Sequence, residues 1–151
     1  RLSKLLRSYA ADLLNAGIGG KHSVEVEISS EAETAVIDCD ARLISRAIGN
    51  LVQNSINHNP QGCHISLSLD CISENVSITV ADNGVGLSAE KLRELEEKPH
   101  YMESTDERLD LRHGLGLLLV QQIVEAHDGG FQIENTATQG CKVSLKFPFS
   151  L

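Results

Sequence analysis

The chain has 151 residues, of which 41% are hydrophobic and 23% charged, and its formal net charge is −8. These values match an ordinary globular domain and exclude a disordered chain, a collagen and a disulfide-rich scaffold. The acidic balance argues against a binder of duplex DNA, and no apolar run approaches the roughly 20 residues of a membrane-spanning helix.

The first part of the chain predicts two helices with a strand between them. Apolar residues recur at helical spacing over 2–16, and a glycine-rich stretch at 17–20 ends this helix. Strict alternation of apolar residues with glutamate predicts a strand at 24–28. A second helix is expected over 41–58, with Asp40 as its N-cap. Its expected inward stripe contains Ile44, Ala47, Ile48, Leu51, Val52 and Ile56.

The middle of the chain predicts a β-hairpin. Two segments of alternating polarity, 63–72 and 76–82, are separated by a turn at Ser73, Glu74 and Asn75. Alternation at period two means that each strand has one dry face and one wet face.

The last part of the chain predicts a loop, a helix and a strand. Ser88 can cap a short helix that extends to Glu96, and residues 97–112 are polar without a clear period. A connection this long usually has a function or is disordered, so we expect a mobile loop there. A mostly apolar helix is predicted over 114–127, and a final alternating strand at 143–147.

These elements together predict a two-layer α/β sandwich, in which helices cover one face of a mixed, mostly antiparallel sheet. We expect a single domain over residues 1–151. The chain begins with Arg1 rather than Met and has no signal peptide, which predicts that it was excised from a longer protein. Four cysteines lack metal-binding spacing and are expected to be small buried residues in a reducing compartment: Cys39, Cys63, Cys71 and Cys141.

Three asparagines share one stripe of the second predicted helix. Asn50, Asn54 and Asn57 recur at i, i+4 and i+7, so they lie within roughly 60° of one another. Asparagine is a poor helix former, so the stripe needs a reason beyond helix stability. It is either a solvated polar face or a row of amides directed at phosphates and a hard cation such as Mg²⁺.

Two glycine-containing segments are further candidates for a ligand site. Asp82 ends a predicted strand and leads into a turn with Gly84 and Gly86. A carboxylate there can accept a hydrogen bond from an exocyclic amine, and the glycines let the backbone approach a ring edge that a Cβ would block. An ordinary Asp-Asn-Gly turn is the alternative. Gly114 and Gly116 open the apolar helix, where unpaired N–H groups favour anions. This segment fits neither a Walker sequence nor a Rossmann fingerprint.

The order of these motifs resembles the catalytic ATP-binding domain of bacterial sensor histidine kinases. Residues 50–58 (NLVQNSINH) look like the N box of that family, residues 82–87 (DNGVGL) like its G1 box and residues 113–117 (HGLGL) like its G2 box. Residues 122–130 resemble the segment after the G2 box, so the resemblance covers nearly the whole chain. It implies the Bergerat fold, ATP and Mg²⁺ as cofactors, and protein-histidine kinase activity in two-component signalling.

The resemblance also implies roles for individual residues. Asp82 would accept a hydrogen bond from the adenine amino group, Asn54 would bind Mg²⁺, and Asn50 would lie near the phosphates. Asn50 and Asn54 are thus the expected catalytic residues. His58 falls where the family often has an aromatic residue over the nucleotide, and residues 88–112 would form the ATP lid. The other residues expected around the nucleotide are Asn57, Gly84, Gly86, Leu87, Arg112, His113, Gly114, Leu115, Gly116, Leu117 and Cys141.

Several positions depart from the family pattern. Asn57 stands where many members have a basic residue, and residues 112–113 replace an upstream glycine and threonine of the G2 box. Residues 138–141 read Thr-Gln-Gly-Cys where many members read Gly-x-Gly-Thr, so Cys141 replaces a threonine hydroxyl beside the adenine. No segment between residues 90 and 101 clearly matches the F box of the family.

Three functions remain open at this point. The first is the ATP-binding half of a protein-histidine kinase. The second is an ATP-hydrolysing relative, but such relatives use a glutamate one helical turn before the metal-binding asparagine. This chain has Asn50 there, and an amide cannot act as a general base near neutral pH. The third is a pseudokinase that binds nucleotide without chemistry.

The expected partners follow from the first of these functions. No histidine of the chain lies in the phosphoacceptor setting of the family, so the acceptor is expected on a separate dimerisation domain. The isolated chain should then bind ATP without autophosphorylation. We expect a response-regulator receiver domain as a further partner and no nucleic acid. The chain is expected to be a monomer and to lie in the cytoplasm, within a homodimeric, membrane-anchored parent.

Overall fold

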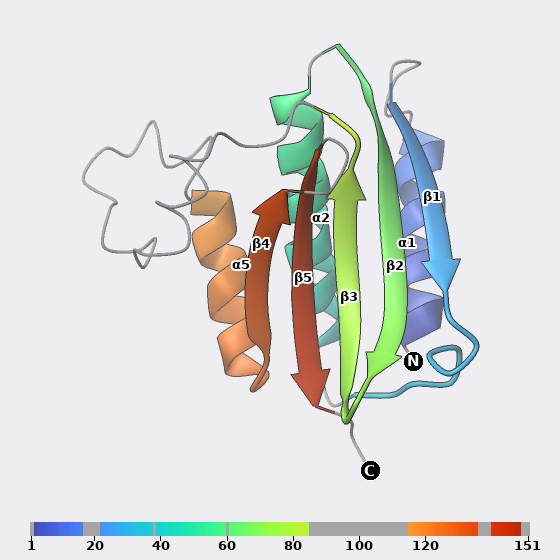
Figure 1. Ribbon diagram of the computed structural model, residues 1–151, viewed down its shortest axis with the longest axis vertical. Helices are drawn as coiled ribbons and strands as arrows, with labels where there is room; N and C mark the ends of the chain where they lie inside the picture. The colour runs from blue at the N-terminus through green and yellow to red at the C-terminus, as the bar shows by residue number, and fades with distance from the viewer. Residues whose placement is uncertain are drawn as a thin grey trace.

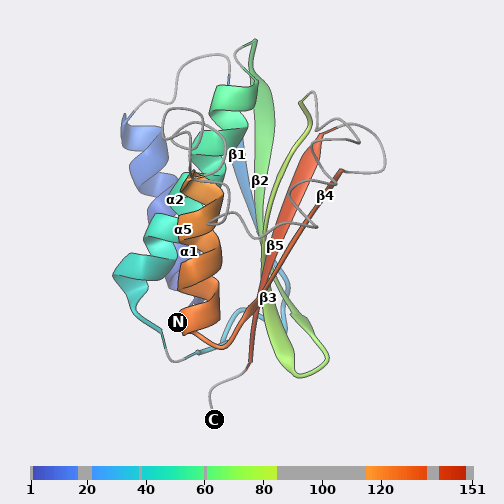
Figure 2. The same ribbon diagram turned by 90° about the vertical axis from the view of Figure 1, so that its left-hand side faces the viewer.

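The computed structural model describes residues 2–16, 22–37, 39–59, 61–84, 115–135 and 140–148. These residues form two layers, a five-stranded sheet and a layer of helices that covers one face of it (Figures 1 and 2). The helices are α1 (Leu2–Ala16), α2 (Ala41–His58) and α5 (Leu115–Ala126). The strands are β1 (His22–Ile28), β2 (Cys63–Ile72), β3 (Asn75–Asp82), β4 (Gly130–Asn135) and β5 (Cys141–Pro148). The predicted α/β sandwich is confirmed.

The sheet is mixed, as predicted, with the strand order β1-β2-β3-β5-β4. β1 runs parallel to β2, and the other neighbouring strands are antiparallel. β2 and β3 form the predicted hairpin, with Ile72 opposite Asn75, so the turn contains only Ser73 and Glu74. Ser73 has a φ of 56°, because a two-residue hairpin turn requires the left-handed region.

α2 forms as its sequence predicts. The Asp40 side chain accepts a hydrogen bond from the Arg42 N–H at 3.0 Å, which confirms the N-cap. Ile56 is only half-buried, but the other residues of the predicted inward stripe are buried: Ile44, Ala47, Ile48, Leu51 and Val52. Two polar residues continue the stripe toward the end of the helix, Ser55 and Asn59, which are 8% and 3% exposed.

One strand was not predicted, and several elements differ from their predicted bounds. β1 and β3 begin at His22 and Asn75 rather than at residues 24 and 76, and β5 covers Cys141–Pro148 rather than 143–147. The sequence did not predict β4, because only Phe131 and Ile133 alternate with polar residues there, and two apolar residues are too few to establish a period. β4 nevertheless pairs with β5, opposite Cys141–Lys146. α5 begins and ends one residue inside the predicted range of 114–127.

The four cysteines, all within the described residues, form no disulfide. Cys63 is buried as expected, but Cys39, Cys71 and Cys141 are only partly buried, so the expectation of uniformly buried cysteines is wrong. These three lie in a loop or near a strand end, where the two layers cover side chains less completely. Among the helices described, none combines the length and the apolar character that crossing a membrane would require.

Candidate nucleotide site

The predicted site residues that the structure describes lie at one edge of the sandwich. α2 and β3 end at this edge, and α5 and β5 begin there, at the top of Figure 1. The topology explains this, because β3 is antiparallel to β5 and therefore ends where β5 begins. Asn54, Asp82 and Cys141 thus reach the same edge from three segments that are far apart in sequence.

Asp82, the last residue of β3, is 6% exposed and accepts three hydrogen bonds. Its Oδ2 accepts from the Ser55 hydroxyl at 2.9 Å. Its Oδ1 accepts from the Gly84 N–H at 3.0 Å and from the Cys141 N–H at 3.3 Å. Hydrogen bonds to a buried carboxylate replace those lost from water. The three donors come from α2, β5 and the turn after β3, and together they hold the carboxylate in one orientation.

Two glycines beside Asp82 are required by close packing within the protein. A Cβ on Gly84 would lie 1.8 Å from the Asn59 Oδ1, and a Cβ on Gly140 would lie 1.9 Å from the Asp82 carbonyl oxygen. Gly140 also has a φ of +121°, a conformation that strains other residues. The sequence predicts that Gly84 makes room for a ligand, but in the structure the Asn59 side chain needs this space.

The three asparagines of the predicted stripe differ in their surroundings. Asn57 is exposed, and its Oδ1 accepts a hydrogen bond from the Gln53 Nε2 at 3.1 Å. Asn50 and Asn54 are half-buried, and within the described residues their side-chain amides form no hydrogen bond. Asn50 and Asn54 therefore have amides available to a ligand. Asn57 also fits the other explanation of the stripe, a polar helix face in contact with solvent.

Several predicted contacts lie outside the described residues. These are Gly86, Leu87, Arg112, His113 and Gly114, together with the lid expected at 88–112 and the short helix expected from Ser88. For four further residues, only the helical backbone is described: His58 in the last turn of α2, and Leu115, Gly116 and Leu117 in the first turn of α5.

Two thiols near Asp82 have raised pKa values. Burial, and then the negative charge of Asp82, raises the pKa of Cys141 from its ordinary value of 9.0 to about 11. The same causes, in the same order, raise the pKa of Cys63. A thiol with a raised pKa remains protonated at neutral pH and is a poor nucleophile. Cys141 therefore contributes its backbone N–H and its bulk to the site rather than reactive chemistry.

Ser55 and Asn59 belong to this site, although the sequence patterns did not identify them. The Asn59 Nδ2 donates to the Ser55 carbonyl oxygen at 2.8 Å, and the Asn59 carbonyl oxygen accepts from the Gly62 N–H at 2.9 Å. One signal was available, because both residues follow Leu51 at i+4 and i+8 on the inward stripe. A polar residue at an inward position predicts a buried hydrogen-bond partner.

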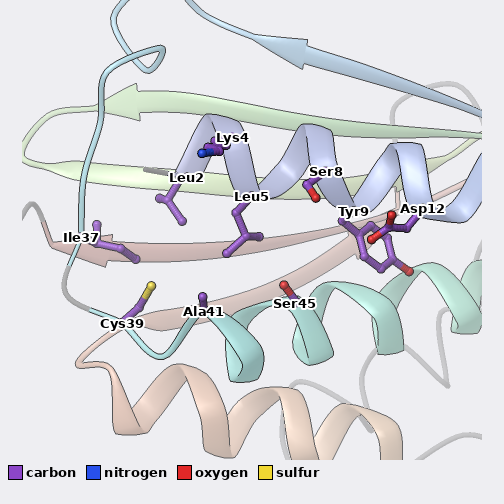
Figure 3. A pocket seen from close by; sticks show the side chains of 10 residues that line it. All are labelled: Leu2, Lys4, Leu5, Ser8, Tyr9, Asp12, Ile37, Cys39, Ala41 and Ser45. Atoms are coloured by element: carbon purple, nitrogen blue, oxygen red, sulfur yellow. The ribbon is translucent and has the colours of Figure 1, made fainter.

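A cavity of about 480 Å³ lies in another part of the structure, between α1 and the first half of α2 (Figure 3). Tyr9 and Asp12 of α1 and Ser45 of α2 contribute to its wall. None of the predicted nucleotide residues lines it, and the asparagines lie in the second half of α2. The candidate site is therefore the edge that contains Asp82, not this cavity.

Comparison with known proteins gives both a family and a set of relatives. Residues 39–151 match the family described as histidine kinase-, DNA gyrase B- and HSP90-like ATPase. The phosphate regulon sensor protein PhoR of Haemophilus influenzae is 27% identical over 137 residues, which cover 91% of this chain and 31% of that protein. The histidine protein kinase DivJ of Caulobacter vibrioides is 32% identical over 115 residues, which cover 76% of this chain and 19% of that protein. The chain thus spans less than a third of the length of these relatives.

Solved structures share the fold. The catalytic domain of histidine kinase ThkA has a TM-score of 0.76 at 22% identity, covering 97% of this chain and 91% of that one. Full-length ShkA in complex with AMPPNP has a TM-score of 0.76 at 18% identity, covering 99% of this chain and 30% of that one. The two-layer fold, the family match and the motifs around Asp82 agree: this chain belongs to the family of histidine kinase-, DNA gyrase B- and HSP90-like ATPases.

Proposed function

We propose that the chain is the catalytic ATP-binding domain of a sensor histidine kinase. It binds Mg-ATP and donates the γ-phosphoryl group to a histidine on a separate dimerisation domain. The buried Asp82 carboxylate, held by three donors where α2, β3 and β5 meet, is the observation that supports this most directly. The relatives are sensor proteins and histidine kinases by name, which supports the same function.

The two ends of ATP would be held by different elements. Asp82 would accept a hydrogen bond from the adenine amino group, because an ionised carboxylate can only accept. The first backbone N–H groups of α5 would face the phosphates, where the helix dipole favours negative charge. Fixing both ends orients the γ-phosphoryl group, and catalysis of phosphoryl transfer consists mainly of positioning and charge stabilisation.

Mg²⁺, when bound, would neutralise charge on the phosphates. The residues at the site fit this ion, because Asn54 offers a neutral amide oxygen and Mg²⁺ normally combines few protein ligands with phosphate oxygens and waters. The Asn54 amide is also without a hydrogen bond to the described residues. Asn54 would therefore hold the ion, and Asn50, one helical turn earlier, would lie near the phosphates.

Asn50 favours transfer over hydrolysis. Hydrolysis needs a group that orients and deprotonates water, and an amide cannot remove a proton near neutral pH. Within the described part of α2, no carboxylate occupies the turn before Asn54. The nucleophile would instead be a histidine on the dimerisation domain.

The partners extend this proposal to the longer protein. The phosphorylated histidine would pass its phosphoryl group to a response-regulator receiver domain. The parent would be a homodimer anchored to a membrane with this domain in the cytoplasm, whereas the isolated chain would be a monomer.

Calorimetric titration with a non-hydrolysable ATP analogue, with and without Mg²⁺, tests the proposal. We expect Mg²⁺ to strengthen binding of the analogue. Asn54→Ala should remove this Mg²⁺ dependence and leave adenosine affinity unchanged, because only ligands with phosphates and metal reach Asn54. Arg46→Ala, on an exposed position of the same helix, is the matched control. Absence of binding at millimolar analogue would overturn the proposed function, and equal loss of adenosine and ATP affinity would make Asn54 structural.

A further inference from the structure

The two oxygens of the Asp82 carboxylate have different surroundings. Oδ1 accepts two backbone hydrogen bonds, from Gly84 at 3.0 Å and from Cys141 at 3.3 Å. Oδ2 accepts one hydrogen bond, from the Ser55 hydroxyl at 2.9 Å. A carboxylate has about four acceptor positions, two on each oxygen. Within the described residues, the protein therefore fills both positions on Oδ1 and one position on Oδ2.

Ser55 is directed at Asp82 although a helix offers it another partner. A serine inside a helix commonly donates to the carbonyl four residues earlier, which for Ser55 belongs to Leu51. Instead the hydroxyl bonds the carboxylate of a strand that lies 27 residues further along the chain. Ser55 is 8% exposed and Asp82 is 6% exposed, so little water competes for this bond.

The direction of this hydrogen bond restricts the ligand. An ionised carboxylate has no proton, so the Ser55 hydroxyl must be the donor and Oδ2 the acceptor. The position left on Oδ2 can then only accept a hydrogen bond, so a ligand group at this position must be a donor. An amino group satisfies this position, whereas a carbonyl oxygen would face a carboxylate with no proton between them.

We propose that Ser55 is the positioning residue that sets the nucleobase specificity of this site. Its hydroxyl occupies one position on Oδ2 and holds the plane of the carboxylate. The other position is thereby directed at the exocyclic amine of an aminopurine, in preference to the carbonyl of an oxopurine. The inference rests on the proposed function, since it takes ATP as the ligand that Asp82 contacts.

The test compares ATP with inosine triphosphate, which carries a carbonyl in place of the amino group. Dissociation constants for both nucleotides are measured by calorimetry for the wild type, Ser55→Ala and Ser45→Ala. Ser45 is a half-buried serine on the same helix, in the wall of the cavity away from Asp82 (Figure 3). We expect Ser55→Ala to weaken ATP binding about fivefold to tenfold, which corresponds to about 1–1.4 kcal/mol and is the size of one ordinary hydrogen bond. The same variant should change inosine triphosphate affinity by less than about twofold, so its preference for ATP over inosine triphosphate falls. Ser45→Ala should have the same preference as the wild type.

The outcomes separate a positioning role from a structural one. Equal weakening of both nucleotides, or an unchanged preference, in a folded Ser55→Ala variant would overturn the proposal. Ser55→Cys keeps the side-chain volume with a weaker donor and should give an intermediate preference. It also provides the answer if Ser55→Ala does not fold, because an unchanged preference in Ser55→Cys would equally overturn the inference. A wild type that binds neither nucleotide contradicts the proposed function itself, whereas binding without this loss of preference contradicts only the role of Ser55.

Discussion

Asp82 and its donors give the sharpest predictions at the scale of single residues. In Asp82→Asn, the amide oxygen can keep the backbone donors of Gly84 and Cys141, and the new NH₂ group can donate to Ser55 if its hydroxyl rotates. Folding should therefore survive the change. The second N–H of the amide would then point at the ligand where the carboxylate offered an acceptor. This N–H cannot bond the amino group of adenine, but it can donate to the carbonyl oxygen of inosine.

We expect Asp82→Asn to lower ATP affinity at least tenfold, the size of a charge-assisted hydrogen bond, and to narrow or reverse the preference over inosine triphosphate. Calorimetry provides both affinities, and thermal unfolding checks the fold. Unchanged ATP affinity with an unchanged melting temperature would remove Asp82 from the site.

Cys141 should make the stability of the protein depend on pH in the alkaline range. Its pKa is about 11 in the folded protein and near 9.0 when unfolded, so between these values the unfolded state binds fewer protons. Stability from the protonated thiol is thus fully present below pH 9 and is lost as pH rises toward 11. At pH 10 the loss attributable to Cys141 should be about 1 kcal/mol.

Urea unfolding at pH 8 and pH 10 measures this loss. Lysines and tyrosines also titrate in this range, so the comparison is between the wild type and Cys141→Val, which has no titrating group at this position. The variant should lose about 1 kcal/mol less than the wild type. An equal loss in both proteins would show that the thiol is not shielded as described.

The chemistry of individual residues could be predicted only where a motif marks it. Asp82 could be singled out as a candidate because a carboxylate ends a predicted strand before two glycines, and the structure shows that this carboxylate is buried and held by three donors. Ser55 and Asn59 could not, because their role depends on which strand lies opposite α2, and that is a property of the fold. The sequence predicts a glycine requirement at position 84 for a different reason from the one in the structure, because the Asn59 side chain, not a ligand, occupies the space that a Cβ would need.

At the scale of elements, His127 connects the two helices that carry the site. It follows the last residue of α5, and its Nδ1 donates to the Ile123 carbonyl oxygen at 2.7 Å. Its Nε2 accepts from the Asp40 N–H at 3.1 Å, at the N-cap of α2. One neutral tautomer satisfies both bonds, because the carbonyl can only accept and the amide can only donate. The connection lies at the opposite end of α2 and α5 from Asp82, so it fixes the helices relative to each other at a distance from the site.

We expect His127→Ala to lower the free energy of unfolding by about 1–3 kcal/mol, because it removes two hydrogen bonds and an edge contact with Phe147. Urea unfolding measures the change. Gln122→Ala, at an exposed position on α5, should change stability by less than about 0.5 kcal/mol. If the two variants lose equal stability, His127 does not hold the helices together.

Elements with a clear period could be predicted from the sequence, and short ones could not. α2 has five buried residues at helical spacing and a capping aspartate, so its range follows from the pattern. β4 has only two apolar residues, and its pairing with β5 decides that it becomes a strand. The extra residue assigned to the β2–β3 turn reflects the same limit, because Asn75 is a typical turn residue and only the register places it opposite Ile72.

At the scale of the whole molecule, the fold brings together candidate site residues that lie far apart in the sequence. Motifs on α2, β3 and β5 meet at one edge because the strand order is not the chain order (Figure 1). The described residues include the proposed contacts for a nucleobase and for phosphates. No histidine of the sequence lies in the phosphoacceptor setting of the family. Under the proposed function, phosphoryl transfer therefore needs a second domain that presents a nucleophile.

The most direct test of this account is phosphoryl transfer from radiolabelled ATP, measured on the isolated chain and on a longer protein that includes the proposed dimerisation domain. We predict acid-labile, histidine-linked label only in the longer protein, and loss of that label in Asp82→Asn. The isolated chain should bind ATP but turn it over more slowly than about 1 s⁻¹, below the usual range of working enzymes. Faster hydrolysis by the isolated chain, or a longer protein that binds ATP and remains unlabelled, would contradict the assignment as a histidine kinase domain.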